Sequence, residues 1–300
     1  MSSVLTIGNF DGVHLGHRAL LERLKVYARH AALPATVLTF EPHPREYFAP
    51  DVAPPRLTSL REKLALLERC GADRVHVCRF NRKLAALTAE QFIERIVVRG
   101  LSARHLIVGD DFRFGCSRGG DFAMLQTAGF RHRFGVEAMS TVMVADERVS
   151  SSAVRERLEA GQLEQAARLL GRPYCIAGRV IHGDKLGRRL GFPTANIQLK
   201  RRRVALTGIF AVSVGGVGSV ARHGVASLGV RPTINSLGVP RLEVHLFDWD
   251  MELYREHLTV SFLHKLRDEE KYESLEALSA QIARDVEAAK TYFRGMRVMV

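Results

Sequence analysis

The sequence predicts two domains, an α/β domain with a parallel sheet over residues 1–171 and an antiparallel β domain with a terminal helix over residues 172–300. In the first part apolar strands alternate with amphipathic helices, which implies right-handed crossovers and a sheet covered on both faces. After residues 171–173, Gly-Arg-Pro, short alternating strands follow one another, which is typical of a barrel or sandwich. A length of 300 residues suits two ordinary domains.

Apolar periodicity predicts the elements in order. Thr88 with Gln91, and Ser59 with Glu62, have the spacing of capping boxes that open helices. In the first domain the predicted strands are 3–7, 35–40, 74–78, 104–108 and 135–144, and the predicted helices are 18–32, 59–69, 88–98, 119–128 and 156–170. In the second the predicted strands are 175–182, 209–214, 224–228, 242–247 and 258–263, with a helix after Ser274.

Composition excludes several classes of protein. No apolar run approaches the ~20 residues of a membrane helix, and no secretory signal is apparent. Four scattered cysteines without a Cys-x-x-Cys pair favour a reducing cytoplasm. A net charge of +12 favours anionic partners. The basic run at 200–203 has no interleaved aromatics, so we expect a solvated loop there and no nucleic-acid partner.

Residues 7–17 join the first strand to the first helix through a bend rich in glycine and histidine. Such a bend points backbone N–H groups and the positive end of a helix dipole at an anion. His14 and His17 lie three apart and share a face on a helical turn. Turn glycines alone, or a metal site, are alternatives, but zinc needs three or four ligands. We therefore expect a phosphate site.

Residues 109–115 follow the fourth strand, at the edge of a parallel sheet where ligands bind. Phe112 and Phe114 are placed to flank a planar ring, and Asp110 and Asp111 to accept its N–H groups or approach Mg²⁺. A tight turn with two core anchors is an equally good interpretation of the residues alone.

Serines at 150–152, flanked by Arg148 and Arg155, predict a second phosphate-holding helix start. Serine hydroxyls cap helices, but capping accounts for one serine rather than three.

Residues 183–196 form a glycine-rich loop with no helical continuation, suited to a phosphate tail. Thr194 and Asn196 carry hard oxygen donors suited to Mg²⁺. A long polar turn is an equal alternative on composition.

Glu243 and His245 lie on one face of the strand at 242–247. An acid in an apolar strand is costly to bury unless it is paired or functional, and desolvation would make it a stronger base toward a hydroxyl.

These motifs resemble those of the bacterial bifunctional riboflavin kinase/FAD synthetase family. Residues 8–17, Gly-x-Phe-Asp-Gly-x-His-x-Gly-His, resemble its nucleotidyltransferase signature. Residues 109–115 resemble its flavin-binding loop, and residues 149–155 its Ile-Ser-Ser-Thr-x-Ile-Arg motif with Ser152 in the threonine position. In the second domain, residues 191–196, Gly-Phe-Pro-Thr-Ala-Asn, match its kinase signature, and residues 229–233 resemble its Gly-x-Arg-Pro-Thr turn.

The resemblance implies a Rossmann-like FMN adenylyltransferase domain at 1–171 and a riboflavin-kinase-type antiparallel β-barrel with a terminal helix at 172–300. Riboflavin would be phosphorylated by ATP to FMN, and FMN adenylylated by ATP to FAD plus pyrophosphate, with Mg²⁺ as cofactor. The expected partners are riboflavin, FMN and ATP, without nucleic acid or membrane, and the chain is expected to be a monomer or weak oligomer.

The resemblance also implies residue roles. The catalytic residues would be Glu243, His14, His17 and Arg155. The nucleotide-binding residues would be Gly8, Phe10, Asp11, Gly12, Gly16, Arg148, Ser151, Ser152, Gly183, Lys185, Gly187, Arg188, Gly191 and Pro193. Flavin would contact Asp111, Phe112, Phe114 and Arg231, and Mg²⁺ would bind at Thr194 and Asn196.

The chain departs from the family pattern in places. It begins a few residues before the first strand, Arg255 stands where a glycine is common, and Phe210 replaces a tyrosine. A nucleotidyltransferase for another substrate would share the histidine motif, but it would not account for residues 191–196 or Glu243.

Overall fold

The computed structural model describes residues 2–183, 186–233, 236–249 and 251–298, without the side chains of 186, 231–233, 236–238 and 297–298. The chain forms two compact units. One comprises Met1–Pro54 with Leu60–Ser151, and the other comprises Pro55–Ser59 with Ser152–Val300. No helix of the described part is long and apolar enough to cross a membrane.

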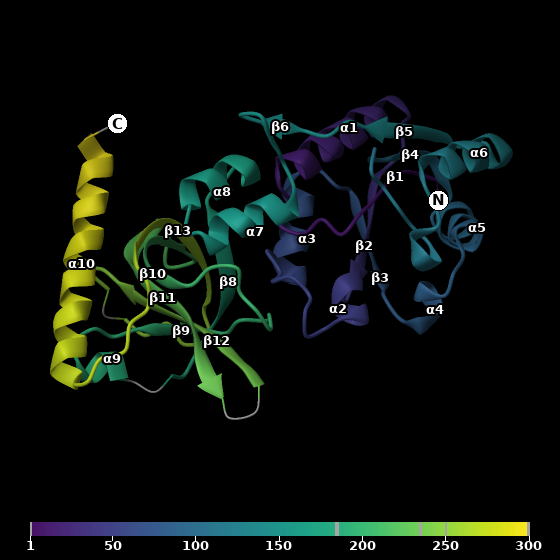
Figure 1. Cartoon of the computed structure of the whole chain (residues 1–300). Helices are drawn as coiled ribbons and strands as arrows, with labels where there is room; N and C mark the ends of the chain where they lie inside the picture. Colours follow the sequence, from purple (N-terminus) through teal and green to yellow (C-terminus); the bar gives the residue numbers. More distant parts are fainter. Residues whose placement is uncertain (1, 184–185, 234–235, 250, 299–300) are drawn as a thin grey trace. The chain divides into compact units, whose positions relative to one another are not determined.

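The first unit is built on a parallel sheet of five strands in the order β3-β2-β1-β4-β5 (Figure 1). The strands are β1 (Ser3–Ile7), β2 (Ala35–Glu41), β3 (Arg74–Arg79), β4 (Ala103–Gly109) and β5 (Gly135–Met139). Ile7 pairs with Leu38, and Thr6 with Ile107, on the two sides of the central strand. Because all five strands run the same way, the loops that follow them meet at one edge of the sheet.

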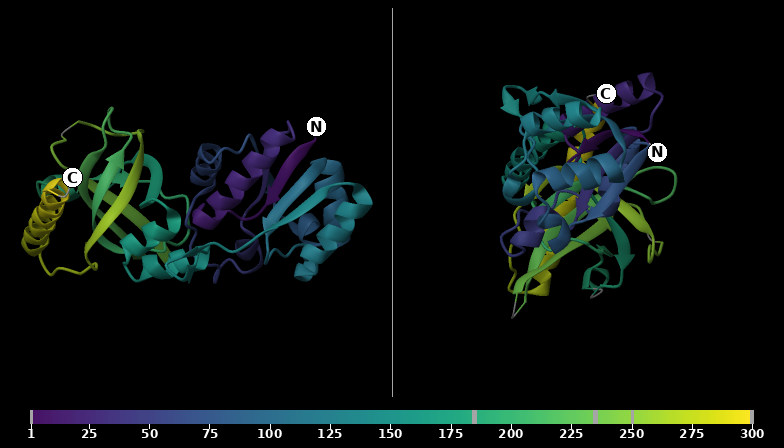
Figure 2. Two further views of the ribbon diagram at one scale, coloured as in Figure 1. Left: turned by 90° about the horizontal axis from the view of Figure 1, so that it is seen from above. Right: turned by 90° about the vertical axis from the view of Figure 1, so that its right-hand side faces the viewer.

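Helices cover both faces of this sheet (Figure 2). On one face α1 (Leu15–His30) and α3 (Leu60–Arg69) pack against Val4 and Val37. On the other, α5 (Ala89–Phe92), its π-helical continuation η1 (Ile93–Gly100) and α6 (Phe122–His132) pack against Leu5 and Leu38. Neighbouring strand residues face opposite sides, so the apolar runs of the sequence supply both cores.

Most predicted elements of this half are confirmed. The differences lie where a turn divides a predicted element in two. The predicted strand at 135–144 is two strands, β5 and β6 (Met143–Val144), and β6 pairs with β7 (Glu147–Arg148). The predicted helix at 156–170 is also two, α7 (Ser151–Glu159) and α8 (Leu163–Leu170). Gly161, with φ +71°, separates them in a conformation that glycine adopts without strain. The short helices α2 (Pro44–Phe48) and α4 (Arg82–Ala85) were not predicted.

The second unit is a closed antiparallel barrel with the strand order β10-β11-β12-β9-β8-β13. Of the two predicted alternatives, a barrel and a sandwich, the barrel is therefore confirmed. The strands are β8 (Tyr174–Ile181), β9 (Ala195–Ile197), β10 (Gly208–Gly215), β11 (Arg222–Thr233), β12 (Ser236–Leu246) and β13 (His257–Arg267). Alternate residues fill the interior: along β12, Leu242 and Val244 are fully buried while Glu243 is partly exposed.

Helix α10 (Leu275–Val298) covers the outer face of β10 and β11. Its Val286, Ala289 and Phe293 pack against Ala211 and Val225. Apolar residues therefore lie on both faces of β10, one toward the barrel interior and one toward the helix.

Two predictions about loops are corrected. The glycine-rich segment 183–196 is not a plain loop, because it contains α9 (Leu186–Arg189) and the start of β9. The basic run at 200–203 is not wholly solvated, because Arg201 is buried and its guanidinium donates to the Leu57 carbonyl at 3.2 Å and to the Tyr174 hydroxyl at 3.0 Å. Arg201 therefore ties the segment before α3 to the barrel unit.

Candidate functional sites

The bend after β1 contains three residues in the left-handed region of backbone conformation. Phe10, Gly12 and Val13 all have positive φ, at 49°, 82° and 42°. Two of these are not glycine, and such conformations persist only where the surroundings enforce them. The Phe10 side chain is 1% exposed and lies in the core beneath the bend. Its predicted part in nucleotide binding can therefore involve only its backbone.

His14 caps the helix that follows the bend. Its Nδ1 accepts a hydrogen bond from the backbone N–H of His17 at 3.3 Å, and the two imidazoles stack with centroids 3.7 Å apart. An accepting Nδ1 leaves the proton of a neutral imidazole on Nε2, where it can be donated to a phosphate oxygen. A Cβ on Gly16 would lie 3.2 Å from the His14 ring, so glycine permits this close arrangement.

His17 is a neutral imidazole with an unused buried nitrogen. Its Nδ1 is buried and has no hydrogen-bond partner. Burial, and then the nearby charges of His14 and Lys63, hold the pKa of His17 well below its usual value. The neighbouring Asn9 Oδ1 is also buried without a partner. Buried polar atoms are normally satisfied, so the bend is suited to a polar ligand.

The serine segment reaches the bend through a hydrogen bond of Ser151. Ser151 Oγ donates to the Asp11 carbonyl at 2.9 Å, which brings the predicted serine to the predicted phosphate site. Ser152 is exposed. Arg155 belongs to the second unit, where its Nε donates to the Pro55 carbonyl at 2.6 Å. Its role toward the leaving phosphates stays a prediction.

The loop after β4 is held in place by contacts of its two aspartates and by the packing of its two phenylalanines. Asp111 pairs with Arg148 at 2.5 Å, which links the predicted flavin loop to a predicted phosphate ligand. Asp110 accepts from the Thr141 backbone N–H at 3.3 Å. Phe112 and Phe114 stack on each other with centroids 5.6 Å apart, and Phe114 is buried. The two rings do not flank an open slot; only the partly exposed Phe112 has a face available to a flavin ring.

In the barrel, the predicted kinase residues come together on neighbouring strands. Thr194 Oγ1 donates to Glu243 Oε2 at 3.4 Å, and Asn196 pairs with Glu243 across β9 and β12. Arg241 Nη1 lies 3.4 Å from Glu243 Oε1; it was not predicted, although its place two residues before Glu243 puts it on the same strand face. The Glu243 side chain is 33% exposed, so its predicted desolvation is only partial.

His245 contacts the backbone of the segment next to Glu243. Its Nδ1 lies 2.9 Å from the Pro193 carbonyl, to which it donates a hydrogen bond. This hydrogen bond holds residues 191–194, Gly-Phe-Pro-Thr, close to Glu243. The assignment of the base to Glu243 stays a prediction.

Glycines let the predicted phosphate loop fold closely on itself. A Cβ on Gly183 would lie 2.2 Å from the Asn196 amide nitrogen, and one on Gly187 would lie 2.4 Å from the Phe192 carbonyl oxygen. Gly191 has φ +85°, and Arg188 is exposed on α9. Lys185 lies outside the described residues, and Arg231 is described only by its backbone, which pairs with Val239.

The described residues contain no cluster of three His, Cys, Asp or Glu side chains that could hold a metal. Thr194, Asn196 and Glu243 offer a different set, two neutral oxygen donors and one carboxylate. This set fits Mg²⁺, which binds few protein ligands and completes its shell with water and substrate phosphates.

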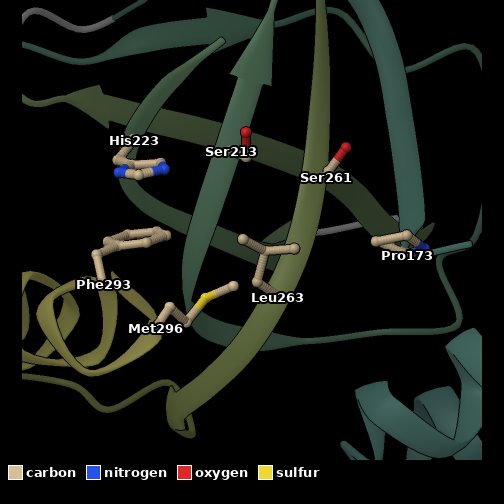
Figure 3. A pocket seen from close by; sticks show the side chains of 7 residues that line it. All are labelled: Pro173, Ser213, His223, Ser261, Leu263, Phe293 and Met296. Carbon is tan, nitrogen blue, oxygen red and sulfur yellow. The ribbon is translucent and has the colours of Figure 1, made fainter. Parts of the chain in front are cut away.

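A groove of about 680 Å³ lies on the outer barrel wall beside α10 (Figure 3). The His223 ring lies parallel to Phe293 with centroids 3.8 Å apart. The other residues that line the groove are Pro173, Ser213, Ser261, Leu263 and Met296. None of the predicted site residues is among them, so neither predicted reaction is assigned to this groove.

Comparison with known proteins covers both halves of the chain. A family model described as FAD synthetase matches residues 1–153, and one described as riboflavin kinase matches residues 170–293. The bifunctional riboflavin kinase/FMN adenylyltransferase of Pseudomonas fluorescens is 53% identical over 287 residues, which are 96% of this chain and 92% of that protein. The protein of the same name from Escherichia coli K12 is 50% identical over 290 residues, with 97% and 92% covered.

A solved structure has a similar fold. The crystal structure described as a macrolide-efflux protein from Streptococcus pneumoniae superposes with a TM-score of 0.80 at 28% identity, covering 96% of this chain and 94% of that one.

Proposed function

Because the chain belongs to the family of bifunctional riboflavin kinase/FMN adenylyltransferases, we propose that its two reactions take place at the two sites described above. The protein phosphorylates riboflavin to FMN and adenylylates FMN to FAD. We assign phosphorylation to the Glu243 site of the barrel and adenylylation to the histidine bend after β1.

One observation carries this assignment: each unit contains its own set of polar groups suited to a phosphate reaction. The bend in the first unit has stacked His14 and His17 and an unused buried nitrogen. The second unit has Thr194 and Asn196 beside the Glu243 carboxylate. A carboxylate next to oxygen donors suits attack by a hydroxyl, whereas a pair of imidazoles suits the stabilisation of a charged phosphate chain.

In the kinase step, Glu243 takes the proton of the ribityl 5′-hydroxyl while that oxygen attacks the γ-phosphorus of ATP. The bond from the γ-phosphorus to ADP breaks, and FMN and ADP leave. Phosphoryl transfer depends mainly on positioning and electrostatic stabilisation. Thr194 and Asn196 would hold Mg²⁺, which when bound offsets the charge on the phosphate oxygens.

In the adenylylation step, an FMN phosphate oxygen attacks the α-phosphorus of ATP directly, and pyrophosphate leaves. The transferred group would be stabilised by the Nε2 proton of His14 and by the side chains of His17 and Ser151. Arg155 and Arg148 would neutralise the departing phosphates. No covalent enzyme intermediate is needed, because the attacking group is already an anion.

We assign adenylylation to a domain of residues 1–171 and phosphorylation to a domain of residues 172–300. We further propose that the chain acts in the cytoplasm as a monomer or weak oligomer, with riboflavin, FMN and ATP as its partners and no nucleic acid. The four free cysteines support the cytoplasmic location. The burial of Arg201 of the basic run supports the absence of a nucleic-acid partner.

Glu243→Gln tests the assignment of the kinase site. Loss of a general base costs about 10²- to 10⁴-fold in rate, so FMN formation from riboflavin should fall by that factor while FAD formation from supplied FMN persists. Glu252→Gln, at an exposed acid of the same unit, is the matched control and should leave both rates unchanged. Equal loss of both activities in Glu243→Gln would contradict separate sites.

A further inference from the structure

The loop between β13 and α10 turns one of its acids back onto the barrel wall. Ser227 Oγ donates a hydrogen bond to Glu269 Oε1 at 3.2 Å. A Cβ on Gly229 would collide with both carboxylate oxygens of Glu269, so glycine lets the carboxylate lie directly against β11. Neither predicted reaction uses this carboxylate, although Gly229 opens the Gly-x-Arg-Pro-Thr motif of the sequence.

Neighbouring acids of the same loop have different contacts. Asp268 forms an ion pair with Lys265 at 2.6 Å, and Glu270 accepts a hydrogen bond from the Tyr272 hydroxyl at 2.9 Å. Glu269 is exposed, and its contact is with a neutral hydroxyl. Because a carboxylate accepts several hydrogen bonds at once, Glu269 keeps acceptor capacity for a ligand that carries hydroxyl groups.

The position of this carboxylate relates it to the predicted kinase base. Ser227 lies directly opposite Glu243 across β11 and β12. Side chains of directly opposed residues share a face of the sheet, with Cβ atoms about 5 Å apart. Val225, two residues before Ser227, packs against α10, so this face is the outer one. Glu269 is therefore one side chain further from Glu243 along the outer face of the barrel.

The strand order gives the kinase site a direction. Asn196, a predicted magnesium ligand, pairs with Glu243 from β9 on one side. Ser227, which holds Glu269, pairs with Glu243 from β11 on the other side. In phosphoryl transfer the attacking oxygen lies between the phosphorus and the rest of the acceptor. With ATP and Mg²⁺ on the β9 side, the remainder of riboflavin extends over β11.

We propose that Glu269, held by Ser227, binds the 2′- to 4′-hydroxyls of the ribityl chain and makes the kinase site selective for a polyol. This inference rests on the proposed function of the Glu243 site. The ribityl hydroxyls donate to the carboxylate, whose orientation is fixed by the Ser227 hydroxyl. The carboxylate also disfavours a triphosphate on the β11 side, because both groups are anionic. Glu269 takes part in binding only, and the proton of the 5′-hydroxyl goes to Glu243.

Two acceptors distinguish binding of the hydroxyls from a structural role. One is riboflavin, and the other is the flavin with a 5-hydroxypentyl chain, which keeps the reacting hydroxyl and lacks the others. A hydrogen bond to a charged group corresponds to about 10- to 100-fold in rate or affinity. In Glu269→Ala, kcat/KM for riboflavin should fall by that factor, whereas kcat/KM for the analogue should stay within about twofold of wild type.

A second variant and a control accompany this comparison. Ser227→Ala removes a neutral hydrogen bond, so the preference for riboflavin over the analogue should fall by about 2- to 10-fold. Glu270→Ala, at the exposed acid next in the chain, is the matched control and should leave kcat/KM for both acceptors unchanged. FAD formation from supplied FMN, measured on the same samples, should be unchanged in all three variants.

Equal losses for the two acceptors in Glu269→Ala would overturn the proposal, because a structural role of Glu269 affects both. A wild-type enzyme without preference for riboflavin, or an unchanged kcat/KM for riboflavin in Glu269→Ala, would also overturn it. Glu243→Gln identifies failure of the proposed function instead: if it phosphorylates both acceptors at the wild-type rate, this face of the barrel is not the kinase site.

Discussion

Arg255 has a backbone conformation that suits the glycine that is common at this position in the family. Its φ is +72°, and its N–H donates to the Val180 carbonyl at 3.1 Å. A left-handed conformation costs a non-glycine residue roughly 1–2 kcal/mol, which is why glycine suits this position. Phe210, the other departure, is fully buried and packs edge-on against Phe262 at 5.2 Å, an environment that accepts the ring without a hydroxyl.

Arg255→Gly should therefore stabilise the protein. The relief of strain exceeds the added freedom of the unfolded chain, so we expect the free energy of unfolding to rise by about 0.5–1 kcal/mol. Arg179→Gly, at an exposed strand position, should lower it by about the same amount. Urea denaturation measures both, and a destabilised Arg255→Gly would contradict this account of the strain.

The candidate sites could be predicted where chemistry depends on residue type and spacing. The contacts among Thr194, Asn196 and Glu243 followed from motifs of that kind. The burial of Phe10 and Phe114 in the core could not be predicted from the sequence. An aromatic residue in a glycine-rich loop suits packing and ligand binding equally well. The burial of Lys63 was not predicted although a signal existed: it occupies an apolar position of its helix, three and four residues before Leu66 and Leu67.

At the scale of elements, strands and helices with strong periodicity were predictable. The turns that interrupt them were not. The periodicity of residues 156–170 continues through Gly161, yet the chain turns there, because packing of α8 against the barrel decides the direction. The π-helical segment η1 likewise has an ordinary helical pattern in sequence. The three-residue strand β9 is too short for its pattern to be distinguished from a loop.

Helix α10 is attached to the barrel by an ion pair that can be tested at this scale. Arg267 Nε and Nη2 donate to the two carboxylate oxygens of Asp285 at 2.8 and 2.7 Å, and Asp285 is 5% exposed. Removing Asp285 leaves the Arg267 guanidinium, whose side chain is only 18% exposed, without its carboxylate partner.

We expect Asp285→Ala to lower the free energy of unfolding by about 3 kcal/mol. Glu287→Ala, which removes the exposed pair with Lys290 on the same helix, should change it by less than about 0.5 kcal/mol. Thermal denaturation of the two variants makes the comparison. Equal, small effects would mean that the apolar contacts of α10 alone hold it in place.

At the scale of the whole molecule, two units with different architectures each carry their own phosphate chemistry. The change from a parallel sheet to a closed barrel was visible as a change in periodicity after residue 171. The unit boundary itself falls at 151/152 and includes residues 55–59 with the barrel. Such long-range association depends on contacts like that of Arg201 with Leu57, which no local pattern contains.

A complementation assay tests the independence of the two sites most directly. His17→Ala and Glu243→Gln are each incubated with riboflavin, ATP and Mg²⁺, and then mixed in equal amounts. We predict that His17→Ala accumulates FMN, that Glu243→Gln forms no FMN, and that the mixture forms FAD. A mixture that accumulates FMN without forming FAD would contradict the account, because an intact adenylylation site would then have failed to use FMN from solution.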